Sequence, residues 1–200
     1  YSDSAFLGQE LVGQVYYRDE SLRFYPFPTV NANKQVTAFS SSQQDTDQYG
    51  MKLTLNSKPM DGWQITWGLD ADHERFTSNQ MFFDLAQASA SGGLNNKKIY
   101  TTGRYPSYDI TNLAVFLQSG YDINNLFTLN GGVRYQYTEN KIDDFIGYAQ
   151  QRQIAAGKAT SADAIPGGSV DYDNFLFNAG LLMHITERQQ AWLNFSQGVE

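Results

Sequence analysis

Apolar and polar residues alternate strictly along residues 63–75, which read WQITWGLDADHER. The apolar positions of this stretch are Trp63, Ile65, Trp67, Leu69 and Ala71. A period of two predicts a β-strand with one apolar and one polar face. Two tryptophans within five residues make the apolar face bulky for a chain whose mean hydropathy is -0.47. The pattern therefore raises the question of what this face contacts.

The same alternation recurs along the chain and predicts seven antiparallel strands that pair in sequence order. The other stretches are 9–18, 47–57, 109–121, 127–139, 174–184 and the residues from 190 onward. On the apolar face we expect Leu53, Trp67, Leu69, Leu117, Val133 and Leu181. On the polar face we expect Lys52, Thr54, Gln118, Asn130, Arg134 and Asn178.

The connections between these strands alternate between short and long. The short ones are 58–62, 122–125 and 185–189, and the long ones are 19–46, 76–108 and 140–173. Compact soluble domains rarely contain loops of about thirty residues. Short turns at one end and long loops at the other are typical of outer-membrane barrels. We therefore predict an all-β fold, a segment of a transmembrane antiparallel up-and-down β-barrel, whose apolar face contacts lipid.

Aromatic residues fall where two membrane-interface girdles are expected. Trp63, Tyr121, Phe127 and Trp192 lie at the short-turn ends, and Tyr17, Tyr49, Tyr137 and Tyr172 at the long-loop ends. Seven strands would leave the two chain ends on opposite sides of the membrane, whereas single-chain bacterial barrels have an even number. The odd number indicates a fragment. The alternative from the pattern alone is a soluble β-sandwich or a repeat array.

Composition changes this picture little. No apolar run reaches about 18 residues, so no transmembrane helix is expected, and the polar face of barrel strands lowers mean hydropathy. The net charge of -7 disfavours nucleic-acid binding, which needs a basic surface. The first residues lack the basic start and apolar core of a signal peptide. The absence of cysteine is compatible with a periplasm-facing protein.

Several segments together resemble the barrel of TonB-dependent siderophore receptors. They are ITNLAVFLQSGYDINNLFTLNGGVRYQYTEN (110–140), AGLLMHITERQQAWLNFSQGVE (179–200) and GQVYYRDESLRFYPFP (13–28), the last being similar to the hydroxamate and citrate-hydroxamate branch. Val199 and His184 depart from residues that the family prefers. The resemblance implies a bacterial outer-membrane barrel of about 22 strands, closed by a plug domain that contacts TonB. Residues 1–200 would then be part of the barrel domain, without the plug and the C-terminal strands.

The resemblance also implies a function and a set of partners. We expect uptake of a ferric siderophore, with ferric aerobactin or a similar citrate-hydroxamate as the ligand. Other expected partners are TonB through the plug, outer-membrane lipid and lipopolysaccharide, and phage or bacteriocins, but no nucleic acid. A passive porin-like channel and a surface adhesin or phage receptor remain the alternatives. A plug domain upstream would separate the first alternative from a siderophore receptor.

Residues 70–74, DADHE, are the strongest candidate for a metal site, because oxygen-rich clusters bind Ca²⁺. We interpret Asp70, Asp72 and Glu74 instead as lumen carboxylates, solvated or paired with the plug and with cations such as Lys52. His73 falls on the lipid-facing side near the long-loop rim, and His184 lies at the opposite rim. The two histidines cannot form one site, so we predict no enzyme and no catalytic residues.

Residues 95–108, NNKKIYTTGRYPSY, are the best candidate for ligand binding. The stretch combines cations with tyrosines: Lys97, Lys98, Arg104, Tyr100, Tyr105 and Tyr108. Such donors suit an anionic siderophore whose carboxylates need charge-assisted hydrogen bonds. The alternative to ligand binding is a solvent-exposed loop whose charges have no binding role. Because a chelator already surrounds the iron, we expect no metal ligands from the protein and no cofactor.

Overall fold

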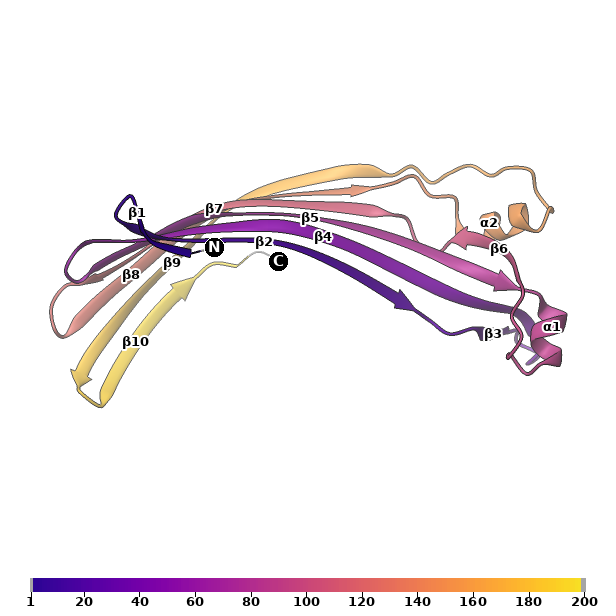
Figure 1. Ribbon diagram of the computed structural model, residues 1–200, viewed down its shortest axis with the longest axis horizontal. Coiled ribbons are helices and arrows are strands. Elements are labelled where there is room, and N and C mark those ends of the chain that lie inside the picture. Colours follow the sequence, from indigo (N-terminus) through magenta and orange to yellow (C-terminus); the bar gives the residue numbers. More distant parts are fainter. Residues whose placement is uncertain (1, 199–200) are drawn as a thin grey trace.

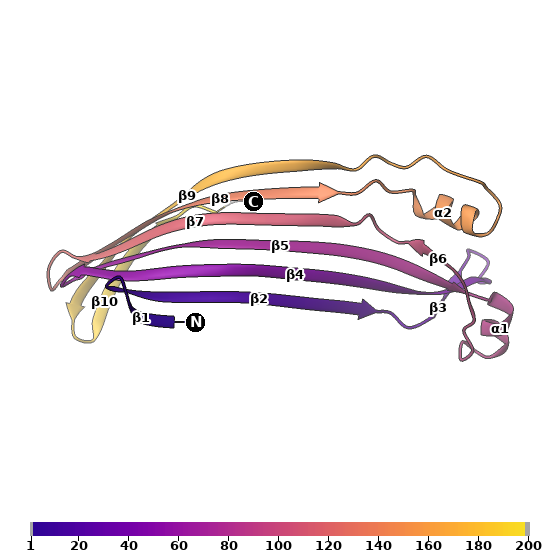
Figure 2. The ribbon, with the colours of Figure 1, turned by 45° about the horizontal axis from the view of Figure 1, so that its top comes forward.

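The computed structural model describes residues 2–198, which form an arched antiparallel sheet with two short helices at one end (Figure 1). Neighbouring strands pair in chain order, as Figure 2 shows for the central part of the sheet. The order is β1 (Ser2–Phe6), β2 (Gln9–Arg23), β4 (Val36–Met60), β5 (Trp63–Phe83), β7 (Tyr108–Asp122), β8 (Phe127–Ile142), β9 (Gly168–Thr186) and β10 (Gln189–Ser196). The predicted all-β fold and its consecutive antiparallel pairing are confirmed.

The main path contains eight strands, so the predicted number of seven is too low. The additional strand is β1, which forms a hairpin with β2 through Leu7 and Gly8. Both turn residues adopt positive φ, 51° and 77°. Tight hairpin turns need this conformation, but leucine is not a typical turn residue and so does not predict a turn. With eight strands, the strand number no longer indicates a fragment.

The strands are also longer than the predicted ten or so residues. β4 has 25 residues and β5 has 21, and both continue far into the predicted long loops. Two short strands lengthen the sheet at this end: β3 (Phe27–Val30) pairs with β4, and β6 (Lys98–Gly103) pairs with β5. The helices α1 (Leu85–Ala90) and α2 (Tyr148–Ala155) lie there too. The long connections are thus largely folded.

The extensions escaped sequence analysis because polar residues interrupt their hydrophobic alternation. Ser40, Ser42, Ser78, Gln80 and Thr102 replace the alternation that marks the lower strands, yet all five are buried. They lie at the loop end, which is where most of the buried residues gather. Within the described chain, neither helix is long and apolar enough to cross a membrane.

The three predicted short connections are confirmed at the opposite end. β4 and β5 are joined through Asp61 and Gly62, and Gly62 has a φ of 74°. The hairpins β7–β8 and β9–β10 also have short turns. Short turns at one end and long connections at the other are the layout that the sequence predicted.

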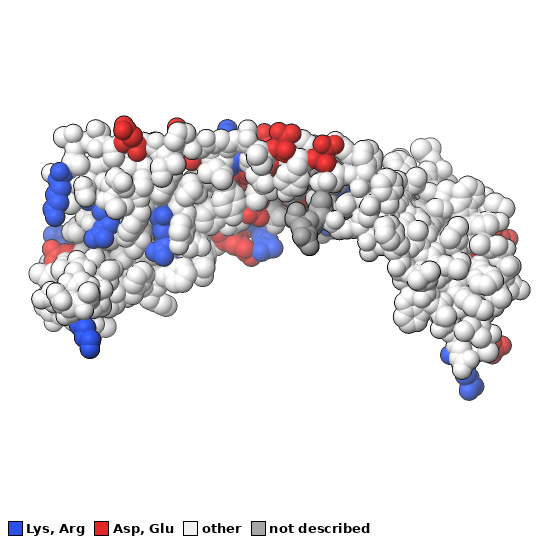
Figure 3. Space-filling model, turned by 180° about the vertical axis from the view of Figure 1, so that it is seen from behind, with Lys and Arg blue, Asp and Glu red and all other residues white. Residues whose placement is uncertain are grey.

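The strand register separates an apolar from a polar face. Leu53 pairs with Leu69, and Trp67 pairs with Leu117, which in turn pairs with Val133. Directly paired residues share a face, so these side chains form one apolar surface. We call the opposite surface, which carries Asp70 and Arg134, the polar face. Charged groups gather toward the loop end, and a wide stretch nearer the short turns is almost free of them on the side seen in Figure 3.

Candidate functional site

A hydrogen-bonded chain at the loop end fixes Arg104, which follows β6 directly. The guanidinium Nη1 donates to Gln80 Oε1 over 3.0 Å, and Gln80 Nε2 donates to Ser40 Oγ over 2.8 Å. The backbone N–H of Arg104 also donates to the carbonyl of Ser78, at 3.3 Å. The guanidinium lies 5.2 Å from the ring centre of Tyr105. Arg104 is thereby held at the rim of the sheet, directly after β6.

Aromatic side chains surround a second arginine on the same side of the sheet. Phe82 of β5 is 2% exposed and stacks on Tyr100 of β6, with ring centres 4.8 Å apart. Arg152 of α2 places its guanidinium carbon 4.8 Å from the centre of the Phe82 ring and 5.8 Å from that of Tyr148. Tyr148 and Phe82 are 6.1 Å apart. We call Phe82, Tyr100, Arg104, Tyr148 and Arg152 the two-arginine cluster.

Regular alternation places this cluster on the polar face. The pairing of β4 with β5 continues without a bulge from Ser57 to Phe39, so Phe82 lies on the same side of β5 as Asp70. Helix α2 docks on β6 through Gln151, whose Oε1 accepts from the N–H of Gly103 at 2.7 Å. Gln151 Nε2 donates to the carbonyl of Ile146 at 2.5 Å. One glutamine thus ties the helix to the sheet.

The electrostatics of the cluster are set by its two guanidinium groups. Burial raises the pKa of Tyr148, while the charges of Arg152 and Arg104 act in the opposite direction. The Tyr148 phenol therefore stays protonated at neutral pH, and the Arg152 guanidinium lies 5.8 Å from the centre of its ring. Among the described residues, neither arginine forms an ion pair with a carboxylate. The cluster carries positive charge that the described side chains do not neutralise.

The structure brings together some of the predicted ligand-binding residues and separates others. Tyr100, Arg104 and Tyr105 lie around the end of β6, and Tyr105 is 47% exposed. Lys97 and Lys98 are exposed at the start of β6. Tyr108 lies apart on β7, where it stacks on Phe76 at 4.8 Å and donates to Glu74 over 3.4 Å.

Sequence analysis missed three members of the cluster: Phe82, Tyr148 and Arg152. Arg152 lies in the long connection 140–173, which contained no predicted site residue. A signal existed in YAQQR, because a tyrosine and an arginine four residues apart meet on one face if the segment is helical. The contact with Phe82 had no such signal, because 66 residues separate Phe82 from Tyr148.

The acidic residues of DADHE each have a partner within the protein. Arg134 Nη1 donates to Asp70 Oδ2 over 2.8 Å, and Asn112 Nδ2 donates to Asp72 Oδ2 over 3.0 Å. Glu74 accepts from Tyr108. The ion-pair partner of Asp70 is Arg134, rather than the expected Lys52. Within residues 2–198 no group of three or more His, Asp or Glu residues is arranged to hold a metal ion.

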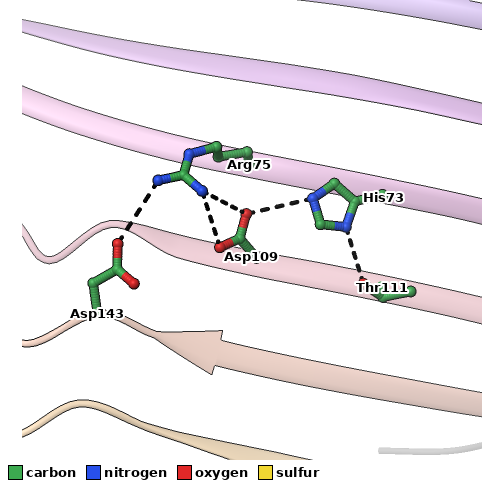
Figure 4. A network of polar contacts seen from close by, with 5 residues as sticks. All are labelled: His73, Arg75, Asp109, Thr111 and Asp143. Carbon is green, nitrogen blue, oxygen red and sulfur yellow. Dashed lines mark hydrogen bonds and ion pairs between the residues drawn. The ribbon is translucent and has the colours of Figure 1, made fainter.

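His73 belongs to a polar network on the opposite, apolar side of the sheet near the loop end (Figure 4). Its Nδ1 lies 2.9 Å from Thr111 Oγ1, and its Nε2 lies 3.4 Å from Asp109. Arg75 contacts the same carboxylate at 3.3 Å and Asp143 at 3.8 Å. A hydroxyl, an imidazole and a carboxylate in line resemble a catalytic triad. Here the Asp109 carboxylate contacts Arg75 as well as His73. The network therefore connects β5 to β7 and to the segment after β8.

The sequence matches the family described as TonB dependent receptor-like, beta-barrel over residues 1–200. It is 94% identical over 200 residues to the ferric aerobactin receptor of Escherichia coli and 46% identical to the rhizobactin receptor of Rhizobium meliloti (strain 1021). The chain spans 27% of the length of each of these relatives. Both are named as receptors, in agreement with the prediction that the chain is not an enzyme.

Solved structures share the fold at low sequence identity. The copper transporter OprC matches with a TM-score of 0.66 and 13% identity, over 94% of this chain and 26% of that one. The unliganded ferric citrate transporter FecA matches with a TM-score of 0.58 and 14% identity, over 96% of this chain and 25% of that one. The predicted family is confirmed: the chain belongs to the TonB-dependent receptor β-barrel family.

Proposed function

We propose that the complete protein is an outer-membrane receptor that imports a ferric siderophore with the help of TonB. The observation that carries this proposal is the 94% identity to a ferric aerobactin receptor along all 200 residues. The preferred ligand is ferric aerobactin or a similar citrate-hydroxamate. Because this chain spans 27% of that relative, the plug and the contact with TonB belong to the rest of the protein.

The two faces of the sheet support a place in the barrel wall. The apolar face, with Trp67, Leu117 and Val133 in one row, suits the hydrocarbon of the outer membrane. The polar face then lines the lumen, and lipid and lipopolysaccharide surround the wall. The loop end, with both helices, lies outside the cell and meets the ligand first.

The charges at the loop end fit an anionic ligand. Arg104 is held by Gln80 and lies against Tyr105, so its donors are oriented before a ligand arrives. Lys97 and Lys98 are exposed and act at longer range by steering the anion. The iron is cargo inside its chelator, so the protein needs no cofactor and supplies no metal ligands.

Equilibrium binding of ferric aerobactin to the complete purified receptor tests this function. Arg104→Ala should weaken binding by roughly ten- to a hundredfold, the effect of one lost charge-assisted hydrogen bond. Lys158→Ala, in another loop, serves as the control and should bind like wild type. Replacing Lys97 and Lys98 should matter mainly at low salt. Failure of the wild-type receptor to bind ferric aerobactin would contradict the proposal.

The rhizobactin receptor among the relatives favours one second candidate, a ligand of that receptor. A competition experiment separates the two. Ferric aerobactin should displace bound ferric rhizobactin from the complete receptor at lower concentration than the reverse. The opposite order would make rhizobactin the better assignment.

A further inference from the structure

Arg104 and Arg152 place two guanidinium groups over the same face of β5. The two arginines come from different connections, since Arg104 follows β6 and Arg152 lies on α2. The guanidinium carbon of Arg152 lies 4.8 Å from the ring centre of Phe82, and Arg104 Nη1 donates to Gln80 Oε1 over 3.0 Å. Gln80 and Phe82 are two residues apart on one face of β5, so the two guanidinium groups are neighbours there, with Tyr148 beside Arg152.

The buried Nε atoms distinguish Arg104 and Arg152 from the other arginines of the described chain. Arg18, Arg75 and Arg134 each contact a carboxylate, while Arg23 donates to Gln43 and Arg188 forms no ion pair with a described residue. Arg104 and Arg152 contact no described carboxylate, and the Nε atom of each is buried without a hydrogen-bond partner. Both side chains are half-buried, and a buried N–H donor without a partner is unfavourable. An anion that binds between the two groups would relieve this cost.

We infer that Arg104, Tyr148 and Arg152 form a subsite for a carboxylate of the ligand. The inference rests on the proposed function and names the part of the siderophore that this site binds. Guanidinium groups match the planar geometry of carboxylates with paired N–H donors, and the phenol of Tyr148 adds another donor. The subsite selects carboxylate-bearing chelates over neutral ones. It exists only while α2 is docked on β6.

A purely structural role of Arg152 makes a different prediction, because its side chain also packs on Phe82. Arg152→Met keeps apolar contact with the ring but removes the charge. Arg152→Lys keeps the charge but loses the paired donors. If Arg152 only supports α2, the Arg152→Met receptor should bind the ligand as tightly as wild type. If Arg152 binds a carboxylate, Arg152→Lys should keep part of the affinity that Arg152→Met loses.

The experiment is equilibrium titration of the complete receptor with ferric aerobactin. Arg152→Met should weaken binding by roughly tenfold or more, and Arg152→Lys by less. Lys158→Met, three residues beyond the end of α2, is the matched control and should stay within about twofold of wild type. Resistance of the folded barrel to heat in detergent verifies that each variant is assembled. Wild-type affinity in an assembled Arg152→Met receptor would overturn the inference.

Citrate alone separates this inference from the proposed function. As a tricarboxylate without hydroxamates, it should raise the thermal stability of the wild-type receptor, and it should have no effect on the Arg104→Gln, Arg152→Met double variant. If ferric aerobactin fails to bind but citrate stabilises in this arginine-dependent way, the function is wrong and the subsite stands. If ferric aerobactin binds and neither arginine matters for either probe, the subsite is wrong and the function stands.

Discussion

Arg134 on β8 reaches past β7 and donates from Nη1 to the Asp70 carboxylate on β5, over 2.8 Å. The guanidinium also lies 6.0 Å from the ring centre of Phe116, on the strand between them. Asp70 is 22% exposed and Arg134 is 35% exposed, so water screens the pair only in part. The pair thus couples three strands across the polar face.

A double-mutant cycle on Asp70→Asn and Arg134→Gln should give a coupling energy of about 1 kcal/mol in favour of the pair. The free energy of unfolding in urea, measured on the complete receptor in lipid bilayers, provides the four values. Arg18 and Glu20, which are 60% and 56% exposed and 2.5 Å apart, form the control pair. Their coupling should be smaller, and a larger value there would contradict the importance assigned to partial burial.

Leu53→Arg should impair assembly far more than Thr54→Arg. The two residues are neighbours on β4 but lie on opposite faces, with Leu53 opposite Leu69 and Thr54 opposite Gly68. An arginine near the bilayer midplane costs about 2 to 4 kcal/mol on the lipid side and little in a wet lumen. Folding yield in lipid bilayers is the measurement. Equal yields for both variants would contradict the assignment of Leu53 to the lipid side and Thr54 to the lumen side.

Gly68→Ala should destabilise the wall. A Cβ atom at Gly68 would collide with the carbonyl oxygen of Leu53 and lie 2.8 Å from Cζ of Phe116. Overpacking of this kind costs about 1 to 3 kcal/mol. Gly168→Ala, at the start of β9, is the control, because a Cβ there meets nothing within 4 Å. The midpoint of urea unfolding should fall for Gly68→Ala and stay unchanged for Gly168→Ala. A similar shift for both variants would contradict the predicted collision at Gly68.

Gln151→Ala should release α2 from the sheet without harming the barrel. The N–H of Gly103 would lose its acceptor, and an unsatisfied partly buried donor costs about 1 to 3 kcal/mol. Hydrogen exchange of residues 143–167 should accelerate, while β7 and β8 keep their protection. Gln150→Ala, on the neighbouring position of α2, is the control. Unchanged exchange in Gln151→Ala would show that other contacts hold the helix.

The sequence contained enough information for the lower part of the wall. Along 63–75 and its neighbours, one face must be apolar, so a period of two marks each strand and its orientation. The faces of Leu53 and Thr54 followed from this pattern alone. Family resemblance then supplied the barrel and the expected ligand class, which no periodicity could supply.

The loop end could not be predicted in the same way. Polar residues interrupt the hydrophobic alternation of the strand extensions around Ser40 and Gln80, so alternation carries no signal there. Gln80 contacts Ser40 of β4 and Arg104 after β6, which are distant in sequence. Arg104 was a candidate because residues 95–108 combine cations with tyrosines, whereas the contact of Arg152 with Phe82 depends on how α2 docks. Tertiary packing of this kind leaves little local trace.

Transport of radiolabelled iron tests the central claim most directly. Cells that lack their own receptor and express the complete wild-type protein should accumulate iron from ferric aerobactin, and only when TonB is present. Cells with Arg152→Met should accumulate much less at limiting ligand, and they should approach wild-type uptake when the ligand is raised about tenfold or more. Uptake that does not depend on TonB would contradict the account and favour a passive channel.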